Sequence, residues 1–222
     1  MRRLRMETMK NTPFYAILFG VLVLSTQMSN AEPKASKLFG GKASASQQTP
    51  SALGKYAKGC LAGAVQMPES GPTWQAMRLS RNRNWGHPEM ISFLKRFSAK
   101  AAEQPNWAGL YIGDISQPRG GPMTSSHQSH QLGLDADVWL LPPKRLNLSR
   151  AERDPLSSKT VRSKNHRTVN ANWTPSHMEV IKAAANDPAV DRIFITAPAK
   201  VWMCKNAKGN KKMVTKRAPF LG

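Results

Sequence analysis

Residues 127–137 read H-Q-S-H-Q-L-G-L-D-A-D and are the most informative stretch of this chain. They place two imidazoles, His127 and His130, and two carboxylates, Asp135 and Asp137, directly before the apolar run 138–141 (VWLL). Imidazole and carboxylate are the ligands of catalytic zinc sites, which take three protein ligands and leave one position for water. The spacing predicts a metal site, still one ligand short, on a loop that enters a strand.

The segments around this motif predict an α+β fold with a small, mainly antiparallel sheet flanked by helices in a single domain. Residues 88–102 carry apolar side chains at helical spacing after a Gly-His-Pro break, and residues 175–186 predict a second helix. Strands are predicted at 110–115, before a glycine-rich loop, and also at 138–141 and 192–195. The strands and helices do not alternate regularly, which favours α+β over α/β.

The N-terminal residues predict export from the cytosol. Residues 1–31 combine a basic start, a short apolar run and a Ser-Asn-Ala site, as in a secretory signal peptide cut before Glu32. An uncleaved N-terminal anchor is the alternative. Residues 32–51 are rich in small and polar side chains and are predicted to be a disordered or loosely attached lead-in. The folded domain is expected to span residues 52–222, in a chain long enough for one well-buried core.

The chain is strongly basic, with a formal net charge of +20. Removal of the predicted signal leaves about +17, which favours an anionic partner. Nucleic acid is the common partner for such a charge, but an exported protein rarely meets it, and no recognition motif for it is present. We therefore expect peptidoglycan first and anionic lipid second. A basic surface that only keeps the protein soluble is the alternative.

Two cysteines, Cys60 and Cys204, are the only ones in the chain. Export to an oxidising compartment permits a disulfide bond. The sequence leaves open whether the two pair with each other or with other partners.

The central motif resembles a known signature. Ser129, His130, Gly133, Asp135 and Asp137 match the S-H-x-x-G-x-D-x-D pattern of the LAS group of zinc peptidases, which cut peptidoglycan. Within that group the chain is most similar to the penicillin-insensitive murein endopeptidase family. Further similarity lies in the Met77-Arg78 pair with the 85–88 block (WGHP), in Ile112-Gly113-Asp114 with Gly120-Gly121, in 173–175 (WTP), in 181–196 and at Cys60. The resemblance covers roughly residues 52–222.

The resemblance implies a hedgehog- or DD-peptidase-like fold and a periplasmic, zinc-dependent D,D-endopeptidase. Such an enzyme hydrolyses the D-alanyl-diaminopimelate cross-link between peptidoglycan stem peptides. By the resemblance, His130 and Asp137 are zinc ligands, His127 is a further histidine in the metal site, and Asp135 orients a ligand or the loop. Ser129 and Gly133 are supporting positions of the same motif.

The remaining polar residues have two interpretations each. Arg78, Arg81 and Arg83 either bind stem-peptide carboxylates, which suits the guanidinium fork, or lie in solvent. His87 at a helix start and His177 within a helix are interpreted as structural. His166 lies in the polar insert 144–172, where a second metal contact is the alternative.

One feature of the family is not found in the sequence. Family members carry a C-terminal H-x-H box that supplies the third zinc ligand, and residues 216–222 resemble the segment that leads into it, but no histidine follows His177. We therefore expect the domain to be C-terminally truncated, and the catalytic residues stay unassigned. A peptidoglycan-binding protein without catalysis is the main alternative to an enzyme. A nucleic-acid or membrane binder and a serine hydrolase using Ser126 or Ser129 are further alternatives.

Overall fold

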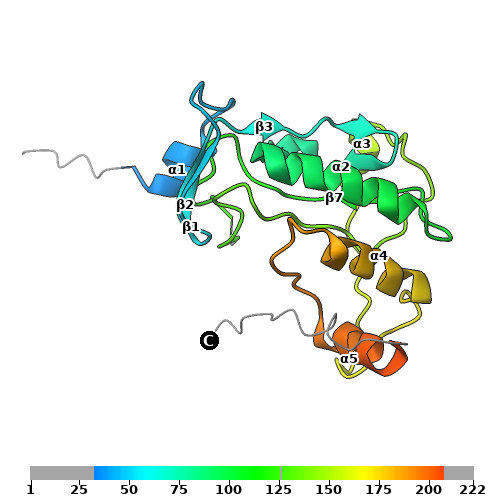
Figure 1. Cartoon of the computed structure of the whole chain (residues 1–222). Coiled ribbons are helices and arrows are strands. Elements are labelled where there is room, and N and C mark those ends of the chain that lie inside the picture. The colour runs from blue at the N-terminus through cyan, green and yellow to red at the C-terminus, as the bar shows by residue number, and fades with distance from the viewer. Residues whose placement is uncertain (1–32, 126, 208–222) are drawn as a thin grey trace, which may run out of the picture. The chain divides into compact units, whose positions relative to one another are not determined.

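Short strands and the helices that flank them make up the computed structural model, which describes residues 33–125 and 127–207 (Figure 1). Strands β1 (Ser51–Lys55) and β2 (Lys58–Ala62) form an antiparallel hairpin, and β3 (Val65–Gln66) pairs antiparallel with β6 (Trp85–Gly86). None of the described strands closes into a barrel. The α+β prediction, with small, mainly antiparallel sheets in one domain, is confirmed.

The third sheet positions the candidate site. Its order is β4 (Ser70–Gly71), β5 (Trp74–Ala76) and β7 (Leu110–Ile112), with β4 antiparallel and β7 parallel to β5. All three residues of β7 are buried, which explains their apolar character. Because β5 and β7 are parallel, the residues that follow them leave the sheet at the same edge. The 3-10 helix η1 (Leu79–Arg81) lies in the segment that follows β5.

Helix α2 (Pro88–Ala102) matches the predicted helix in both bounds and forms the centre of the main core. It begins with Pro88 after the N-cap His87, whose ring nitrogen accepts a hydrogen bond from the Glu89 backbone. Its apolar face packs against β7 and against helix α4 (Pro175–Asn186), as Figure 1 shows. The buried members of this face are Ile91, Phe93, Leu94, Phe97 and Ala101.

Helices α4 and α5 (Ala197–Asn206) enclose a second core cluster around Trp173, Ile181 and Met203. The bounds of α4 agree with the prediction, whereas α5 was not predicted. The strand predicted at 192–195 was wrong. Ile193 and Ile195 are half-buried and alternate with exposed neighbours, as in a strand, but no described strand lies beside them to complete a ladder.

The strand predicted at 138–141 is also largely wrong. Val138 forms a single antiparallel bridge with Ile112, and the Trp139 backbone N–H donates to the Tyr111 carbonyl at 3.0 Å. Pairing stops there because β7 is only three residues long and the run ends at two prolines. The polar insert after it contains one short helix, α3 (Arg150–Arg153), which begins with a capping box.

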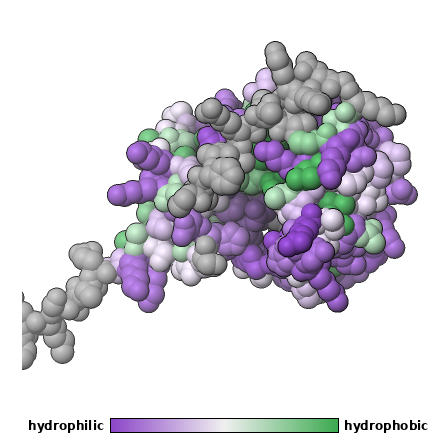
Figure 2. Space-filling model, turned by 90° about the horizontal axis from the view of Figure 1, so that it is seen from below, coloured by the Kyte–Doolittle hydropathy of each residue, from purple (hydrophilic) through white to green (hydrophobic). Residues whose placement is uncertain are grey.

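The predicted lead-in is partly ordered in the structure. Residues 35–40 form helix α1 (Ala35–Gly40), and the segment after it is tied to the domain where Ser46 Oγ accepts a hydrogen bond from the Gly63 backbone at 3.0 Å. The predicted signal, residues 1–31, and the segment 216–222 lie outside the described residues. Within the described residues no helix is both long and apolar enough to cross a membrane. Hydrophilic side chains cover much of the face shown in Figure 2, in keeping with the excess of lysine and arginine.

Candidate metal centre

The loop that carries the metal motif, residues 127–137 (the motif loop), is anchored to the end of β7 by backbone hydrogen bonds. Gly113 N–H donates to the Asp137 carbonyl at 2.8 Å, and Asp137 N–H donates to the Asp114 carbonyl at 2.9 Å. Gly113 has no room for a larger side chain, because a Cβ there would lie 2.9 Å from Trp139 Nε1 and 3.1 Å from Asp137 Cβ. The loop and the strand end therefore approach closely, and Asp137 occupies a fixed position.

The structure brings His127, His130 and Asp137 together. One ligand atom from each lies within 4.8 Å of the others, and no other such group of three occurs among residues 33–125 and 127–207. His130 Nε2 and Asp137 Oδ1 are 3.5 Å apart, and the two imidazole centroids are 5.3 Å apart. The sequence left open whether three residues of one short loop can reach the same ion, and the structure brings all three together.

His130 is held by its backbone and by its second ring nitrogen. Its φ of 68° is left-handed, and its carbonyl accepts a hydrogen bond from the Ser116 hydroxyl at 2.5 Å. Its side chain is only 2% exposed, and Nδ1 lies 3.4 Å from Asp135 Oδ2. A carboxylate behind a histidine fixes the ring orientation and is the usual partner of a metal-binding imidazole.

The two carboxylates determine the protonation of the cluster. Burial lowers the pKa of His130, but the hydrogen bond to Asp137 and the charges of Asp135 and Asp137 outweigh this and raise the pKa to about 9. Burial raises the pKa of Asp137, yet His130, His127 and Arg81 outweigh it and hold the pKa below its usual value. In this arrangement the cluster carries an imidazolium beside a carboxylate at neutral pH.

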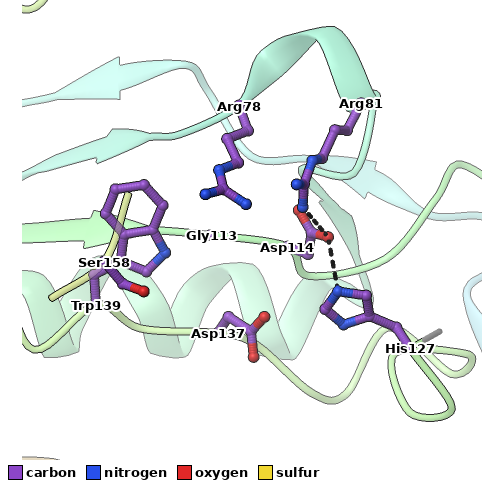
Figure 3. A pocket seen from close by; sticks show the side chains of 8 residues that line it. All are labelled: Arg78, Arg81, Gly113, Asp114, His127, Asp137, Trp139 and Ser158. Carbon is purple, nitrogen blue, oxygen red and sulfur yellow. Dashed lines mark hydrogen bonds and ion pairs between the residues drawn. The ribbon is translucent and has the colours of Figure 1, made fainter. Parts of the chain in front are cut away.

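Asp114 links the metal cluster to two arginines that follow β5. Its side chain is 3% exposed, and Oδ2 accepts hydrogen bonds from Arg83 at 2.8 Å and from Arg81 at 3.1 Å. The same oxygen lies 3.8 Å from His127 Nε2. Figure 3 shows Asp114 between Arg81 and His127, with Asp137 directed toward the same pocket from the opposite side.

These residues line one pocket of about 110 Å³. Its lining combines the strand end, the metal motif and two segments that follow β5 and α3: Arg78, Arg81, Gly113, Asp114, His127, Asp137, Trp139 and Ser158. The pocket contains charges of both signs beside the three candidate ligands, which suits a polar substrate.

Gly133 shapes the loop behind the cluster. Its φ is +65°, and a Cβ there would lie 2.4 Å from Leu61 Cδ2 and 2.9 Å from the His87 backbone nitrogen. Its carbonyl accepts a hydrogen bond from His87 N–H at 2.9 Å. The motif glycine therefore permits the loop to pack against the start of α2, because only glycine adopts this conformation without strain.

The other sequence-predicted residues lie in different environments. Ser129 is half-buried, and its side chain makes no hydrogen bond to another described residue. His87 caps α2, and His177 is fully buried between the rings of Trp107 and Trp173, so both are structural as expected. His166 is exposed on the insert, away from the cluster.

Both cysteines are free in the structure. Cys60 is half-buried on β2 and Cys204 is exposed on α5. They do not pair with each other.

The donor set fits a zinc ion. Ligand atoms on a tetrahedral zinc with bonds of about 2.0–2.1 Å lie roughly 3.3 Å apart. The distance of 3.5 Å between His130 and Asp137 is close to this separation, and Asp135 behind His130 completes the expected arrangement. His127, His130 and Asp137 are therefore the residues that would hold the ion.

Two pocket residues were missed by the sequence analysis. Trp139 was interpreted only as part of a strand, although its position two residues after Asp137 places it beside the loop. Ser158 lies in the polar insert, and no sequence signal distinguished it.

Comparison with known proteins agrees with this geometry. The family model described as penicillin-insensitive murein endopeptidase matches residues 52–222. The chain is 38% identical over 174 residues to the penicillin-insensitive murein endopeptidase of Haemophilus influenzae, covering 78% of this chain and 60% of that protein. It is 38% identical over 175 residues to the protein of the same name from Yersinia enterocolitica, covering 78% and 63%. A Klebsiella pneumoniae relative of that name is 32% identical over 214 residues, covering 96% and 74%.

The chain thus spans less than two thirds of the length of the first two relatives. The match nevertheless includes the whole candidate metal centre and the sheet that positions it. The chain belongs to the penicillin-insensitive murein endopeptidase family.

Proposed function

We propose that this protein is a metal-dependent peptidase that hydrolyses D-alanyl-diaminopimelate cross-links in peptidoglycan. The observation that carries the proposal is the convergence of His127, His130 and Asp137 within 4.8 Å at the end of β7. Family membership supports peptidoglycan as the substrate, since the relatives are named murein endopeptidases. The basic surface supports an anionic polymer as the partner.

The proposed cofactor is zinc, held by His130, Asp137 and His127. When bound, zinc supplies a Lewis acid for an amide carbonyl and lowers the pKa of water toward neutrality. Asp135 keeps the His130 ring oriented through Nδ1, and Asp114 lies behind His127. The pocket beside Asp137 is open to the scissile peptide, and its arginines offer donors to polar groups of the substrate.

We further propose that residues 1–31 direct export, that residues 52–222 form the endopeptidase-like domain and that the protein acts in the periplasm. Access to the peptidoglycan cross-link requires this location. The position of the site at the end of strand β7 supports a domain that holds its ligand residues on a rigid sheet.

The experiment is digestion of purified, cross-linked peptidoglycan by the protein, with separation of the released muropeptides. We expect cross-linked dimers to decrease and monomers to accumulate, and a His130→Ala variant to lose this activity. A Glu103→Gln variant is the control, because Glu103 is exposed at the end of α2 and, among the described residues, forms an ion pair with Lys100 alone. Sedimentation with peptidoglycan but no release of monomers would refute catalysis and favour a wall-binding protein.

A further inference from the structure

One arginine of the pocket stands out by its position on the sheet. Ala76 of β5 pairs with Ile112 of the parallel strand β7. Arg78 follows the end of β5 and Asp114 follows the end of β7, so both residues leave the sheet at the edge where the metal loop is anchored. Arg78 and Asp137 both line the pocket, and Figure 3 shows both side chains directed into it.

Arg78 has no carboxylate partner in the described part of the chain. Its guanidinium lies 5.5 Å from the ring centroid of Trp139, and Nη2 donates a hydrogen bond of 2.9 Å to the exposed hydroxyl of Ser157. No described carboxylate lies within 4.0 Å of it. The Trp139 ring thus makes a cation–π contact with the guanidinium, which has further N–H donors besides the one bonded to Ser157.

The neighbouring arginines are different. Arg81 and Arg83 both donate to Asp114, and Arg83 is 11% exposed. Their charges are offset by a buried carboxylate, whereas the charge of Arg78 faces the pocket. Arg78 is thus the pocket arginine whose charge is not offset by any described carboxylate.

The backbone supports a functional role for Arg78. Its φ of 52° and ψ of 50° are left-handed, which is uncommon for a residue other than glycine. His130 has a similar conformation with φ of 68°. Residues other than glycine in this conformation cluster at active sites and ligand-binding sites, which is consistent with a functional role for Arg78.

We propose that Arg78 binds a carboxylate of the peptide substrate next to the scissile bond. The pocket of about 110 Å³ is large enough for a carboxylate group together with ordered water. A planar guanidinium with free N–H groups is matched to a carboxylate in a bidentate arrangement. The substrate class is therefore a peptide with a free carboxylate within about one residue of the cleaved amide.

This inference rests on the proposed function for the identity of the substrate, but its test does not require hydrolysis. The probes are N-acetyl-D-alanine and its carboxamide, which differ only in the carboxylate. Binding is followed by two-dimensional NMR through the Trp139 indole N–H and the Gly113 backbone N–H, both of which border the pocket. The titration is performed on the full chain in its metal-free and zinc-loaded forms.

The expected result is a preference for the carboxylate that depends on Arg78. Arg78→Gln is expected to weaken carboxylate binding about ten- to hundredfold, the size of a charge-assisted hydrogen bond, with the carboxamide unchanged. Arg78→Lys keeps the charge but not the fork and is expected to fall between the two. Arg96→Gln is the matched control, because Arg96 is exposed on α2 and pairs with Asp187. It is expected to bind like the unchanged protein.

Two results overturn the inference. Equal loss of carboxylate and carboxamide binding in Arg78→Gln, with an unchanged melting temperature, would indicate that Arg78 shapes the pocket without recognising the charge. Unchanged carboxylate binding in that variant would place the ligand elsewhere. If Arg78→Gln proves unstable, Arg78→Asn supplies the same test, because asparagine tolerates the left-handed conformation.

The outcome is separable from that of the proposed function. Arg78-dependent carboxylate binding without peptidoglycan hydrolysis would retain the inference and refute the enzyme. Hydrolysis with a KM that does not distinguish carboxylate from carboxamide peptides, in both the unchanged protein and Arg78→Gln, would retain the enzyme and refute the inference.

Discussion

The buried carboxylate of Asp114 is expected to stabilise the domain strongly, and Asp114→Asn tests this. The substitution keeps the shape of the side chain but removes the charge that Arg83 and Arg81 face at 2.8 and 3.1 Å. Arg83 is 11% exposed, so its charge-assisted hydrogen bond is worth about 1.5–3 kcal/mol. Arg81 is 36% exposed, and its pair contributes about 0–1 kcal/mol. The free energy of unfolding should therefore fall by about 1.5–4 kcal/mol.

Chemical denaturation followed by tryptophan fluorescence measures this change. Glu103→Gln is the matched control, because it removes a single carboxylate from an exposed pair with Lys100 and is expected to cost at most about 0.5 kcal/mol. A loss below about 1 kcal/mol in Asp114→Asn would refute the reasoning. It would mean that the arginines find equivalent partners in water once the carboxylate is neutral.

Four further predictions concern the core, the motif loop and the dependence of stability on pH. Leu94→Ala, at a fully buried position on α2, should lower the free energy of unfolding by about 2–5 kcal/mol in the same denaturation assay. Gly133→Ala should lower the free energy of unfolding by about 2–4 kcal/mol, because the φ of +65° is strained for alanine and a Cβ would lie 2.4 Å from Leu61. A change below about 0.5 kcal/mol would show that the loop shifts freely. Burial holds the pKa of His177 below its usual value, so the unfolded chain takes up the proton at a higher pH than the folded chain. The free energy of unfolding should therefore fall as the pH drops below about 6.5. His177→Gln should lack this trend. The pKa of His130 is raised to about 9, so protonation of His130 should stabilise the metal-free protein fully below about pH 6.5. This stabilisation should disappear as the pH rises through about 9. It is measured as the difference in free energy of unfolding between the unchanged protein and His130→Gln.

The parts of the fold with strong local signals were predictable. Helix α2 has an apolar face, a proline at its first position and a capping residue, and both bounds were predicted correctly. Strand β7 was predicted because its residues are continuously apolar, as a strand buried on both faces requires. Its end was placed three residues too late, because after Ile112 the backbone leaves β5 and pairs with the motif loop through Gly113 and Asp137.

The failures share one physical cause. Residues 192–195 alternate between half-buried and exposed side chains, as a strand does, and residues 138–141 are apolar. Whether such a segment joins a sheet depends on a partner strand that is distant in the sequence, and local pattern does not reveal it. Helix α5 was missed because its apolar residues do not follow one face: Val201 is exposed while Ala199 and Met203 are buried.

The candidate site was predictable in its residues but not in its contacts. His127, His130, Asp135 and Asp137 are close in sequence and carry the chemistry of a metal site. The convergence of the first two with Asp137 depends on the left-handed conformation of His130 and on the pairing of the loop with β7. The different roles of Arg78 and Arg83 depend on Asp114. The fold brings Asp114 into hydrogen-bond contact with Arg83, and the sequence does not show this contact.

The measurement that tests the account most directly is the zinc content of the purified protein, determined by elemental analysis beside His130→Ala and the Glu103→Gln control. The account predicts close to one zinc per chain in the unchanged protein and in the control, and a loss of most of it in His130→Ala. Full zinc content in His130→Ala, or no zinc in the unchanged protein after incubation with excess metal, would contradict the assignment of the metal centre.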